Sequence, residues 1–325
     1  MKALDTHSAP EALTDCLMSR NWLEPGERVK NVSKAGEGNM NVVLRARTNK
    51  RSLIVKQSRP YVQKYPDIAA PLDRIHTEER FYRAVSGSGI EAHLPRLLGF
   101  DPAEHLLLLE DLGQAEDMTF LYGTRSIEPE TLDTLVAVLG RIHATPAPAD
   151  FPDNLALRGL NHQHIFVLPF LEHNGFALDS IQPGLEELAA PFKADAGLKA
   201  TVSALGDRYL GAGTVLLHGD YYPGSWLQAS GEVYVIDPEF SFAGFAEFDL
   251  GVMAAHLLMA TGEPEIVNRV LERYPGPANR ELTLQVAGTE IVRRLIGLAQ
   301  LPLERSLEEK AYLLRLARNF LLHAN

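Results

Sequence analysis

The sequence has almost no cysteine and no long hydrophobic run. One cysteine, Cys16, stands in 325 residues, which excludes an internal disulfide and a zinc site built on cysteines. No segment approaches the roughly 18 apolar residues of a membrane span, and the N-terminus has no apolar segment of signal-peptide length. Positive charge is also in deficit, since the formal net charge is −11, which argues against broad binding to nucleic acid or anionic membranes. We therefore expect a cytoplasmic protein with neither nucleic acid nor membrane as a partner, and leave a homodimer open.

The pattern of apolar residues divides the chain into a strand-rich part and a helix-rich part. With 46% hydrophobic and 22% charged residues, the chain is globular in composition and long enough for two lobes. The patterns predict strands over 28–35, 42–48, 52–56, 94–100 and 105–109, and helices over 9–22 and 72–85. Helices follow over 128–144, 195–210, 248–261, 264–274, 280–301 and 306–322, the last with a capping-box pattern of Ser306 and Glu309. We place the boundary after residue 111, which gives a first lobe of 1–111 and a second of 112–325.

The segment over 216–251 has carboxylates at the ends of its apolar runs. One run ends near Asp220, and the next leads into Asp237 and Glu239. Residues 229–232 between them have the composition of a tight turn, so we expect a hairpin-like unit that brings the three carboxylates close together. Clustered carboxylates raise one another's pKa unless a cation neutralises them. Mg²⁺ is the expected cation, because it binds oxygen ligands together with substrate phosphates.

Three earlier features fit a site for nucleotide phosphates. Gly36 and Gly38 lie between the first two predicted strands, where glycine lets the backbone approach phosphates closely; an ordinary hairpin turn is the alternative. Lys56 ends the third strand and either extends to solvent or reaches ATP phosphates while a helix glutamate holds it. Glu78 and Glu79 are the candidates for that glutamate, and we favour Glu78.

An apolar strand over 106–109 is followed by Glu110, Asp111 and Leu112. A strand that ends in a polar hinge suits a boundary between lobes, and its exposed backbone groups can meet the edge of an adenine ring. A buried strand followed by a plain loop is the alternative that the sequence leaves open.

The order of these features is the one that phosphoryl transfer from Mg·ATP requires. A glycine-rich hairpin, a strand lysine, a helix glutamate, a hinge, a His-x-Asp pattern and an apolar-Asp pattern follow in one direction. They would supply a cover for the phosphates, a cation beside them, a base facing the acceptor hydroxyl and carboxylates for the metal. We therefore interpret the chain as a kinase that uses ATP and Mg²⁺.

The same segments carry a resemblance to a known family. His218, Gly219 and Asp220, followed by Asp237, resemble the protein-kinase-like fold of the aminoglycoside and choline phosphotransferases. The longer patterns LLHGD-x-x-x-GS, V-x-VIDPEF and RR-x-x-G-x-A, with GNMN, IVKQS and LLEDL, resemble the 5-methylthioribose kinases. The resemblance implies an α+β, protein-kinase-like bilobal fold, with a small antiparallel-sheet N-lobe carrying one helix and a larger, mostly helical C-lobe.

The resemblance also implies roles at the centre of the site. Asp220 is implied as the catalytic base that orients the acceptor hydroxyl, and Asp237 and Glu239 are implied as ligands of Mg²⁺. Ser225 stands where most of the superfamily has a metal-binding asparagine, and we carry it as a third metal residue.

Further roles follow for the nucleotide and for the scaffold of the site. The residues implied in ATP binding are Gly36, Gly38, Asn39 and Asn41 over the nucleotide, Lys56 and Glu78 at its phosphates, and Glu110 and Leu112 at the adenine. Structural roles are implied for His218 and for Asp249, which would brace the catalytic loop.

Four residues are candidates for contact with the acceptor. Arg293 and Arg294 are implied at the sugar site, and because adjacent helical residues point about 100° apart, we expect one of them to face it. Tyr221 and Tyr222 adjoin the base, where the methylthioribose kinases have a different stretch. The expected acceptor is a small molecule with a hydroxyl group, 5-methylthioribose or a related pentose.

Two other functions stay open at the level of the sequence. One is an aminoglycoside-, choline- or homoserine-type phosphotransferase, although two arginines favour a neutral or anionic acceptor over a polycation. The other is a nucleotide-binding pseudokinase that serves as a scaffold, which the retention of Lys56, Asp220 and Asp237 disfavours.

Overall fold

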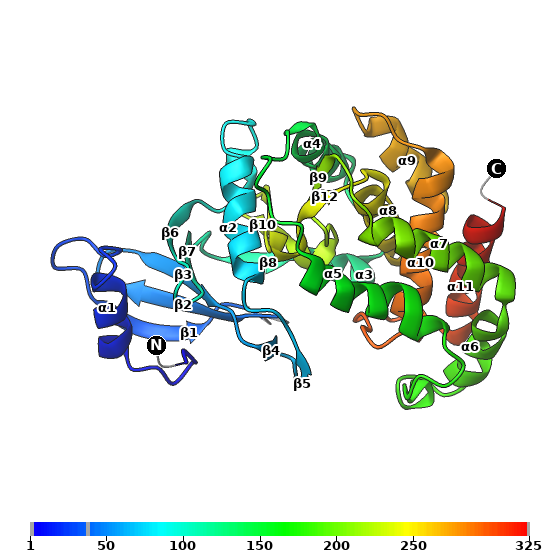
Figure 1. Cartoon of the computed structure of the whole chain (residues 1–325), viewed down its shortest axis with the longest axis horizontal. Helices are drawn as coiled ribbons and strands as arrows, with labels where there is room; N and C mark the ends of the chain where they lie inside the picture. Colours follow the sequence, from blue (N-terminus) through cyan, green and yellow to red (C-terminus); the bar gives the residue numbers. More distant parts are fainter. Residues whose placement is uncertain (1–2, 37–39, 324–325) are drawn as a thin grey trace.

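The first lobe is built on a five-stranded antiparallel sheet (Figure 1). A computed structural model describes residues 3–36 and 40–323. The sheet runs in the order β1-β2-β3-β7-β6, with β1 (Val29–Lys34), β2 (Val42–Thr48), β3 (Ser52–Gln57), β6 (Leu97–Asp101) and β7 (Leu106–Glu110). Each of them corresponds to a strand predicted from the sequence.

Helices cover both faces of this sheet. They are α1 (Pro10–Met18) and α2 (Arg74–Ala84). On β7, Leu106 and Leu108 belong to the same buried cluster as α1, whereas Leu107 and Leu109 belong to the cluster that contains α2. Successive strand side chains point to opposite faces, so the unbroken apolar run of β7 reflects burial on both sides. The lobe therefore carries α1 in addition to the one helix expected of the fold class.

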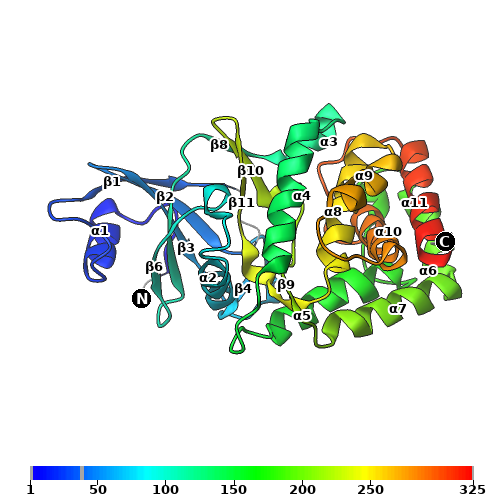
Figure 2. The same ribbon diagram turned by 90° about the horizontal axis from the view of Figure 1, so that it is seen from above.

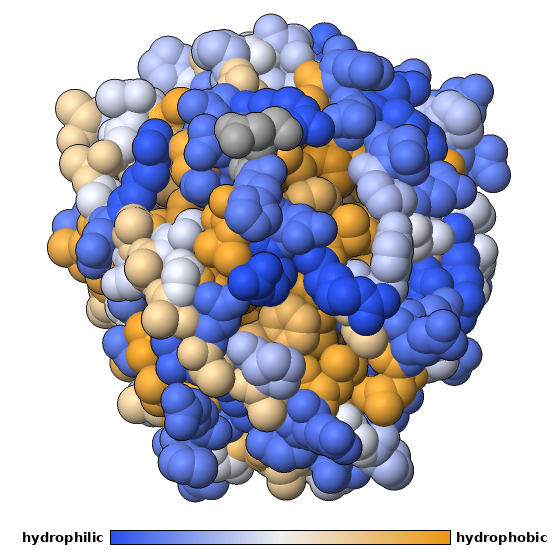
Figure 3. Space-filling view, turned by 90° about the vertical axis from the view of Figure 1, so that its right-hand side faces the viewer, coloured by the Kyte–Doolittle hydropathy of each residue, from blue (hydrophilic) through white to orange (hydrophobic). Residues whose placement is uncertain are grey.

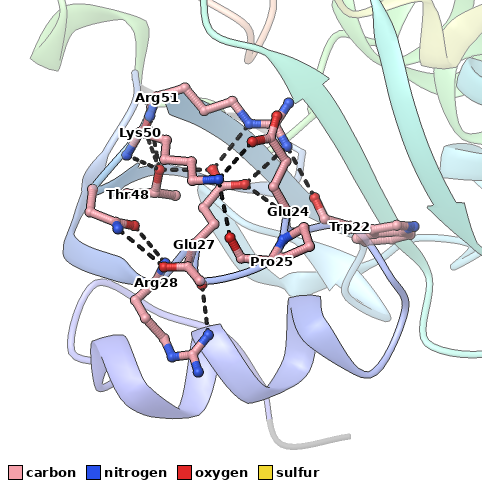
Figure 4. Close-up of polar contacts among 10 residues, drawn as sticks. Trp22, Glu24, Pro25, Glu27, Arg28, Thr48, Lys50 and Arg51 are labelled. Carbon is pink, nitrogen blue, oxygen red and sulfur yellow. Dashed lines mark hydrogen bonds and ion pairs between the residues drawn. The ribbon is translucent and has the colours of Figure 1, made fainter.

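A buried carboxylate fixes the entry of the chain into the sheet (Figure 4). Glu27 is 0% exposed and accepts hydrogen bonds from Thr48 Oγ1 at 2.8 Å, Arg51 Nε at 3.1 Å and the Glu24 amide at 2.9 Å. Burial acts to raise the pKa of Glu27, but these hydrogen bonds outweigh it and hold the pKa below its usual value. The contacts tie the segment before β1 to the β2–β3 turn.

A short ribbon that the sequence patterns did not reveal lies between β3 and α2. It consists of β4 (Tyr61–Val62) and β5 (Tyr65–Ala69), which pair antiparallel. Lys64 and Tyr65 at its turn line a cavity together with residues of the second lobe. The ribbon therefore adds first-lobe residues to a cavity that is otherwise lined mainly by the second lobe.

The second lobe is mostly helical, and a nearly all-buried helix lies at its centre. Its helices are α3 (Leu121–Thr124), α4 (Pro129–Ala144), α5 (Leu155–His162), α6 (Leu185–Ala194), α7 (Ala196–Leu210), α8 (Glu247–Thr261), α9 (Glu265–Arg273), α10 (Arg280–Ile296) and α11 (Leu307–Leu322). Every residue of α8 from Phe248 to Ala260 is buried, as expected for a helix that is apolar on all sides. A Cβ at Gly251 would lie 2.5 Å from Val286 Cβ, so glycine permits the close contact of α8 with α10.

The strand pairing around the carboxylates differs from the expected hairpin. The turn at 229–232 is present and joins β10 (Trp226–Ala229) to β11 (Glu232–Val235), with Ser230 and Gly231 at φ 53° and 86°, the sign that two-residue hairpin turns favour. However, β9 (Val215–Leu217) pairs with β12 (Phe242–Gly244) and not with β11. The expectation that the runs at 216–217 and 233–236 pair with each other was wrong.

Two helix boundaries in the second lobe test the sequence patterns. The capping box of α11 is confirmed, since Ser306 Oγ accepts from the Glu309 amide and Glu309 accepts from the Ser306 amide. In contrast, α10 ends at Ile296 and not at residue 301, because Gly297 is extended with ψ −176°. The segment 297–305 is therefore a loop.

The view from above shows the sheet lobe at one end and α10 and α11 at the other, with β8 (Ala115–Asp117), β10 and β11 between them (Figure 2). β8 pairs with β10, so the chain joins the second lobe directly after β7. At the helical end, hydrophilic side chains cover much of the surface with hydrophobic ones between them (Figure 3). No helix in the described part of the chain is long and apolar enough to cross a membrane.

Candidate active site

A carboxylate on α8, Asp249, holds the loop that carries Asp220. Asp249 is 0% exposed and accepts hydrogen bonds from the amides of His218, at 2.7 Å, and Gly219, at 3.0 Å. Gly219 has φ +85°, and a Cβ there would lie 2.2 Å from Phe240 O, so glycine is required where the two loops touch. These contacts fix the backbone on which Asp220 stands.

His218 connects this loop to the strand that precedes Asp237. It is fully buried; its Nε2 lies 3.0 Å from Ile236 O, and its Nδ1 accepts from the Asp220 amide at 3.3 Å. Nδ1 is therefore the acceptor nitrogen, and Nε2 carries the proton donated to Ile236 O. Because burial lowers the pKa of His218, the ring is a neutral structural link.

Asp220 lies at the meeting point of two cavities described below. Burial raises the pKa of Asp220 to about 6, although the guanidinium groups of Arg294 and Arg293 act to lower it. Arg294 Nη2 lies 3.9 Å from Asp220 Oδ1. The carboxylate is thus positioned to change its protonation state within the range in which an enzyme works.

Lys56 links the two lobes across the cleft. Its Nζ lies 2.7 and 2.8 Å from the two carboxylate oxygens of Glu78 on α2 and 2.7 Å from Asp237 Oδ1. Burial alone would lower the pKa of Lys56, but the carboxylates of Asp237 and Glu78 outweigh it and raise the pKa. Burial raises the pKa of Glu78 to about 7, with Lys56 opposing. The choice of Glu78 over Glu79 as the partner agrees with this geometry.

Glu239 is bound by first-lobe residues. Its Oε2 accepts from Asn41 Nδ2 at 3.0 Å and lies 3.2 Å from Arg74 Nε. Burial raises the pKa of Glu239 to about 7, with Lys56 opposing. Arg74 is fully buried and also donates to Met40 O at 2.7 Å, so it joins α2, the glycine-rich loop and the second lobe. The sequence analysis gave Arg74 no role, although it lies one helical turn before Glu78 on the same face of α2.

The expected metal residues line one small cavity. Asp237, Glu239 and Ser225 line it together with the predicted base Asp220, and the Asp237 side chain is 42% exposed. Carboxylate and hydroxyl oxygens are the ligands that Mg²⁺ prefers, so the donor chemistry fits this ion. Among the described residues, however, no three His, Cys, Asp or Glu side chains are grouped closely enough to hold a metal ion. The close cluster of three carboxylates that the sequence suggested is therefore absent from the described part of the chain.

A cleft of about 430 Å³ lies between the lobes on one side of this cavity. Its apolar walls come from both lobes and include Val43, Ile54, Leu109, Leu227 and Ile236, a composition suited to a flat ring. Gly36, Lys56, Glu110 and Leu112 from the expected ATP site also line it. The Glu110 amide donates to Arg96 O at 3.0 Å. Gly38 and Asn39 lie outside the described residues.

A second cavity, of about 410 Å³, lies on the other side, and we refer to it as the acceptor-side cavity. Asp220, Tyr222, Arg293 and Arg294 line it, and the Arg294 guanidinium stacks on the Tyr222 ring at 5.0 Å. Both arginines therefore face this cavity, where one was expected.

Tyr221 does not face the acceptor-side cavity, and its assignment to the acceptor was wrong. It is 0% exposed, and its hydroxyl donates to Leu135 O at 2.7 Å. In a turn, neighbouring side chains leave in different directions, and that of Tyr221 packs against Trp226 in the core.

Behind the arginines lies a buried hydrogen-bond network that sequence reasoning missed. Glu290 on α10 binds Arg293 Nε at 2.5 Å and Arg294 Nε at 2.8 Å. His256 Nε2 lies 2.9 Å from Glu290 Oε1, and its Nδ1 lies 2.6 Å from the Tyr122 hydroxyl. Burial lowers the pKa of His256 to about 4, so the ring is neutral and donates to Glu290. The spacing of Glu290 to the arginines, three and four residues, was the available signal.

Comparison with known proteins identifies relatives of the chain. The model of the phosphotransferase enzyme family (APH) matches residues 32–282. A methylthioribose kinase of Exiguobacterium sibiricum is 28% identical over 251 residues, which cover 72% of this chain and 62% of that protein. A methylthioribose kinase of Geobacillus sp. strain WCH70 is 27% identical over 88% of this chain and 84% of its own length. The match to the first relative thus spans less than two thirds of its length.

Solved structures agree on the fold. Spectinomycin phosphotransferase APH(9)-Ia, in complex with ADP and spectinomycin, aligns with a TM-score of 0.57 at 15% identity, over 96% of this chain and 97% of that one. This likeness confirms the expected bilobal α+β fold. Because the family model covers well over half of the sequence, the chain belongs to the phosphotransferase enzyme family.

Proposed function

We propose that the protein is an ATP-dependent kinase that transfers the γ-phosphate to a hydroxyl group of a small molecule. The observation that carries this proposal is the position of the small cavity around Asp220 and Asp237. It shares Lys56, Gly224 and Asp237 with the cleft between the lobes, and Asp220, Tyr222 and Gly224 with the acceptor-side cavity. A phosphate donor bound in the cleft and an acceptor bound in the acceptor-side cavity would meet at this small cavity.

In this proposal the protein acts mainly by positioning and by balancing charge. ATP lies in the cleft with its ring between the apolar walls, and the backbone of Glu110 and Leu112 meets the adenine. Lys56, held by Glu78, contacts the phosphates. Asn41 belongs to the glycine-rich loop that covers them. Asp220 orients the acceptor hydroxyl and takes its proton.

Mg²⁺ is part of the proposal. Asp237 and Glu239 would hold the ion, with Ser225 beside them, and when bound it would neutralise charge on the transferred phosphate. Asp237 offers the more accessible carboxylate, since Asn41 and Arg74 already engage Glu239. His218 and Asp249 keep the loop of Asp220 in place.

We propose 5-methylthioribose or a related pentose as the acceptor and the cytoplasm as the location. The relatives named above are methylthioribose kinases. The cationic side chains of Arg293, Arg294 and Lys64 line the acceptor-side cavity, which disfavours a polycationic aminoglycoside. Choline- and homoserine-type acceptors remain as outcomes of the test.

The test is an ADP-release screen over 5-methylthioribose, ribose, choline, homoserine and an aminoglycoside. We expect turnover with the pentoses and a loss of about 10²–10⁴-fold in the Asp220→Asn variant, the range for a lost general base. Nucleotide affinity should persist in that variant, because Asp220 lies outside the lining of the nucleotide cleft. Asp207→Asn, on the exposed side of α7, is the matched control. Wild-type turnover by Asp220→Asn would refute the base, and acceptor-independent nucleotide binding without any turnover would favour a scaffold.

A further inference from the structure

The segment that joins the two lobes contains a buried carboxylate. It follows β7 and covers residues 110–113, and we call it the hinge. The Asp111 side chain is 4% exposed and accepts hydrogen bonds from Arg45 Nε at 2.8 Å, Arg45 Nη2 at 3.1 Å and the Gly113 amide at 3.1 Å. Ser52 Oγ, at the start of β3, donates to the same carboxylate. Asp111 therefore ties the hinge to two strands of the first lobe.

Arg45 makes its contact from β2. Its guanidinium binds both oxygens of Asp111, a forked geometry that fixes orientation as well as distance. Nη2 also donates to Gly113 O at 3.0 Å, and Gly113 has φ +81°, which glycine adopts readily. One side chain thus binds the hinge at positions 111 and 113, on either side of Leu112.

The same residues line the cleft between the lobes. Arg45, Asp111 and Leu112 all belong to its lining, and in the proposed function the backbone of Glu110 and Leu112 meets the adenine. A hydrogen bond weakens steeply when its angle departs from the preferred range, so binding of the base depends on the direction of the Leu112 backbone. A hinge that is already fixed also loses less conformational freedom when the nucleotide binds.

Two neighbouring arginines lack this arrangement. Arg47 lies two residues after Arg45 on the same face of β2, but it is exposed and forms no ion pair among the described residues. Arg96 binds Glu110 through Nε and Nη2, both at 3.0 Å, yet the two side chains are 73% and 32% exposed. Exposed pairs of this kind contribute little, and neither Arg47 nor Arg96 belongs to the lining of the cleft.

From these contacts we propose that Arg45 is a positioning residue for the nucleotide. Through Asp111 and Gly113 it fixes the hinge so that the backbone of Leu112 meets the base. The inference rests on the proposed ATP site and adds a residue that acts at the base, whereas Lys56 acts at the phosphates.

The test measures the binding of ADP and of adenosine to the full chain by titration calorimetry, without an acceptor. Arg45→Met removes the fork but keeps an apolar side chain. It should weaken both ligands by the same factor, at least about tenfold, as for loss of hydrogen bonds to a charged group. Equal factors are informative because adenosine is uncharged, so the loss of a distant positive charge would weaken ADP alone. Lys56→Met should show that second pattern.

The same strand offers a matched control. Arg47→Met makes the same substitution on the same face of β2 and should keep both affinities. Arg45→Lys keeps the charge but cannot form the fork, so it should also bind adenosine more weakly, and it replaces Arg45→Met if that variant does not fold. The double variant Arg45→Met/Asp111→Asn should lose no more than the larger single loss, because both changes act through one contact.

The outcomes separate this inference from the proposed function. Wild-type affinity of the Arg45 variants for adenosine, together with a lower unfolding temperature, would overturn the proposal and leave a contact that only stabilises the fold. A loss confined to ADP would overturn it as well. If the wild type bound no nucleotide, the proposed ATP site and the role of Arg45 would both be refuted. Nucleotide binding without turnover, with the expected losses in the variants, would refute the kinase activity and support the role of Arg45.

Discussion

Asp220 and Asp237 stand on neighbouring loops, but their surroundings give them different chemistry. Asp237 Oδ1 lies 2.7 Å from the Lys56 ammonium group. The Asp220 side chain is only partly buried, and the Arg294 guanidinium lies 3.9 Å from its carboxylate. One carboxylate is therefore suited to bind cations and the other to exchange a proton.

The pH dependence of turnover should follow the ionisation of the Asp220 carboxyl group. Its burial raises the pKa to about 6, and a general base must be ionised to accept the hydroxyl proton. We expect kcat/KM for the acceptor to be level above about pH 7, to be halved near pH 6, and to fall roughly tenfold per pH unit well below that. Initial rates from pH 5 to 8 test this. A rate that stays level down to pH 5 would contradict the prediction, and residual activity of Asp220→Asn should not show the fall.

At the residue scale, the sequence predicted contacts between residues that lie about twenty positions apart on successive elements. Lys56 and Glu78 meet as expected, and Asp220 and Asp237 line one cavity. The role of Arg74 was not predicted, because its partner Glu239 is distant in sequence and comes from the other lobe. Tyr221 was misassigned because adjacency to Asp220 does not fix the direction of a side chain in a turn.

Local sequence patterns predicted where one helix begins, but they did not predict which strands pair. α11 begins where the capping box predicts, because Ser306 and Glu309 satisfy each other's amides within one turn. The pairing of β9 with β12 was not predictable from the same segment, because strand pairing depends on tertiary contacts. Here Ser241 Oγ donates to Leu217 O at 2.6 Å, which fixes the neighbours of β9.

The α11 capping box gives a prediction at the scale of an element. Ser306→Ala removes the acceptor of the Glu309 amide, which lies 3.1 Å from Ser306 Oγ, and should lower the free energy of unfolding by about 1 kcal/mol. Urea unfolding measures it as a lower midpoint with an unchanged slope. Ser203→Ala, on the exposed face of α7, is the control and should be neutral or slightly stabilising, since alanine favours helix. An effect of Ser306→Ala no larger than that of the control would contradict the role of the cap.

At the scale of the molecule, the two lobes are joined by polar contacts that converge on one loop. Lys56 binds Asp237, while Asn41 and Arg74 bind Glu239. The bilobal fold could be predicted from the order of motifs, but the lobe boundary after residue 111 stays a prediction. The position of one lobe relative to the other depends on these contacts between residues far apart in sequence, so local sequence patterns could not predict it. A ligand that engages Asp237 would act on the same contacts that hold the lobes together.

Replacing Asp237 tests this coupling between ligand and lobes. Asp237 has φ +63°, a conformation that asparagine tolerates, so Asp237→Asn should keep the fold while it removes the charge. We expect the affinity for Mg·ATP to fall at least about tenfold, as for loss of a charged contact, with a smaller change for ATP in a chelator. Titration calorimetry with and without Mg²⁺ measures both, and Asp207→Asn serves as the control. Equal affinity of wild type and variant for Mg·ATP would remove Asp237 from the metal site and leave its contact with Lys56 as a link between the lobes alone.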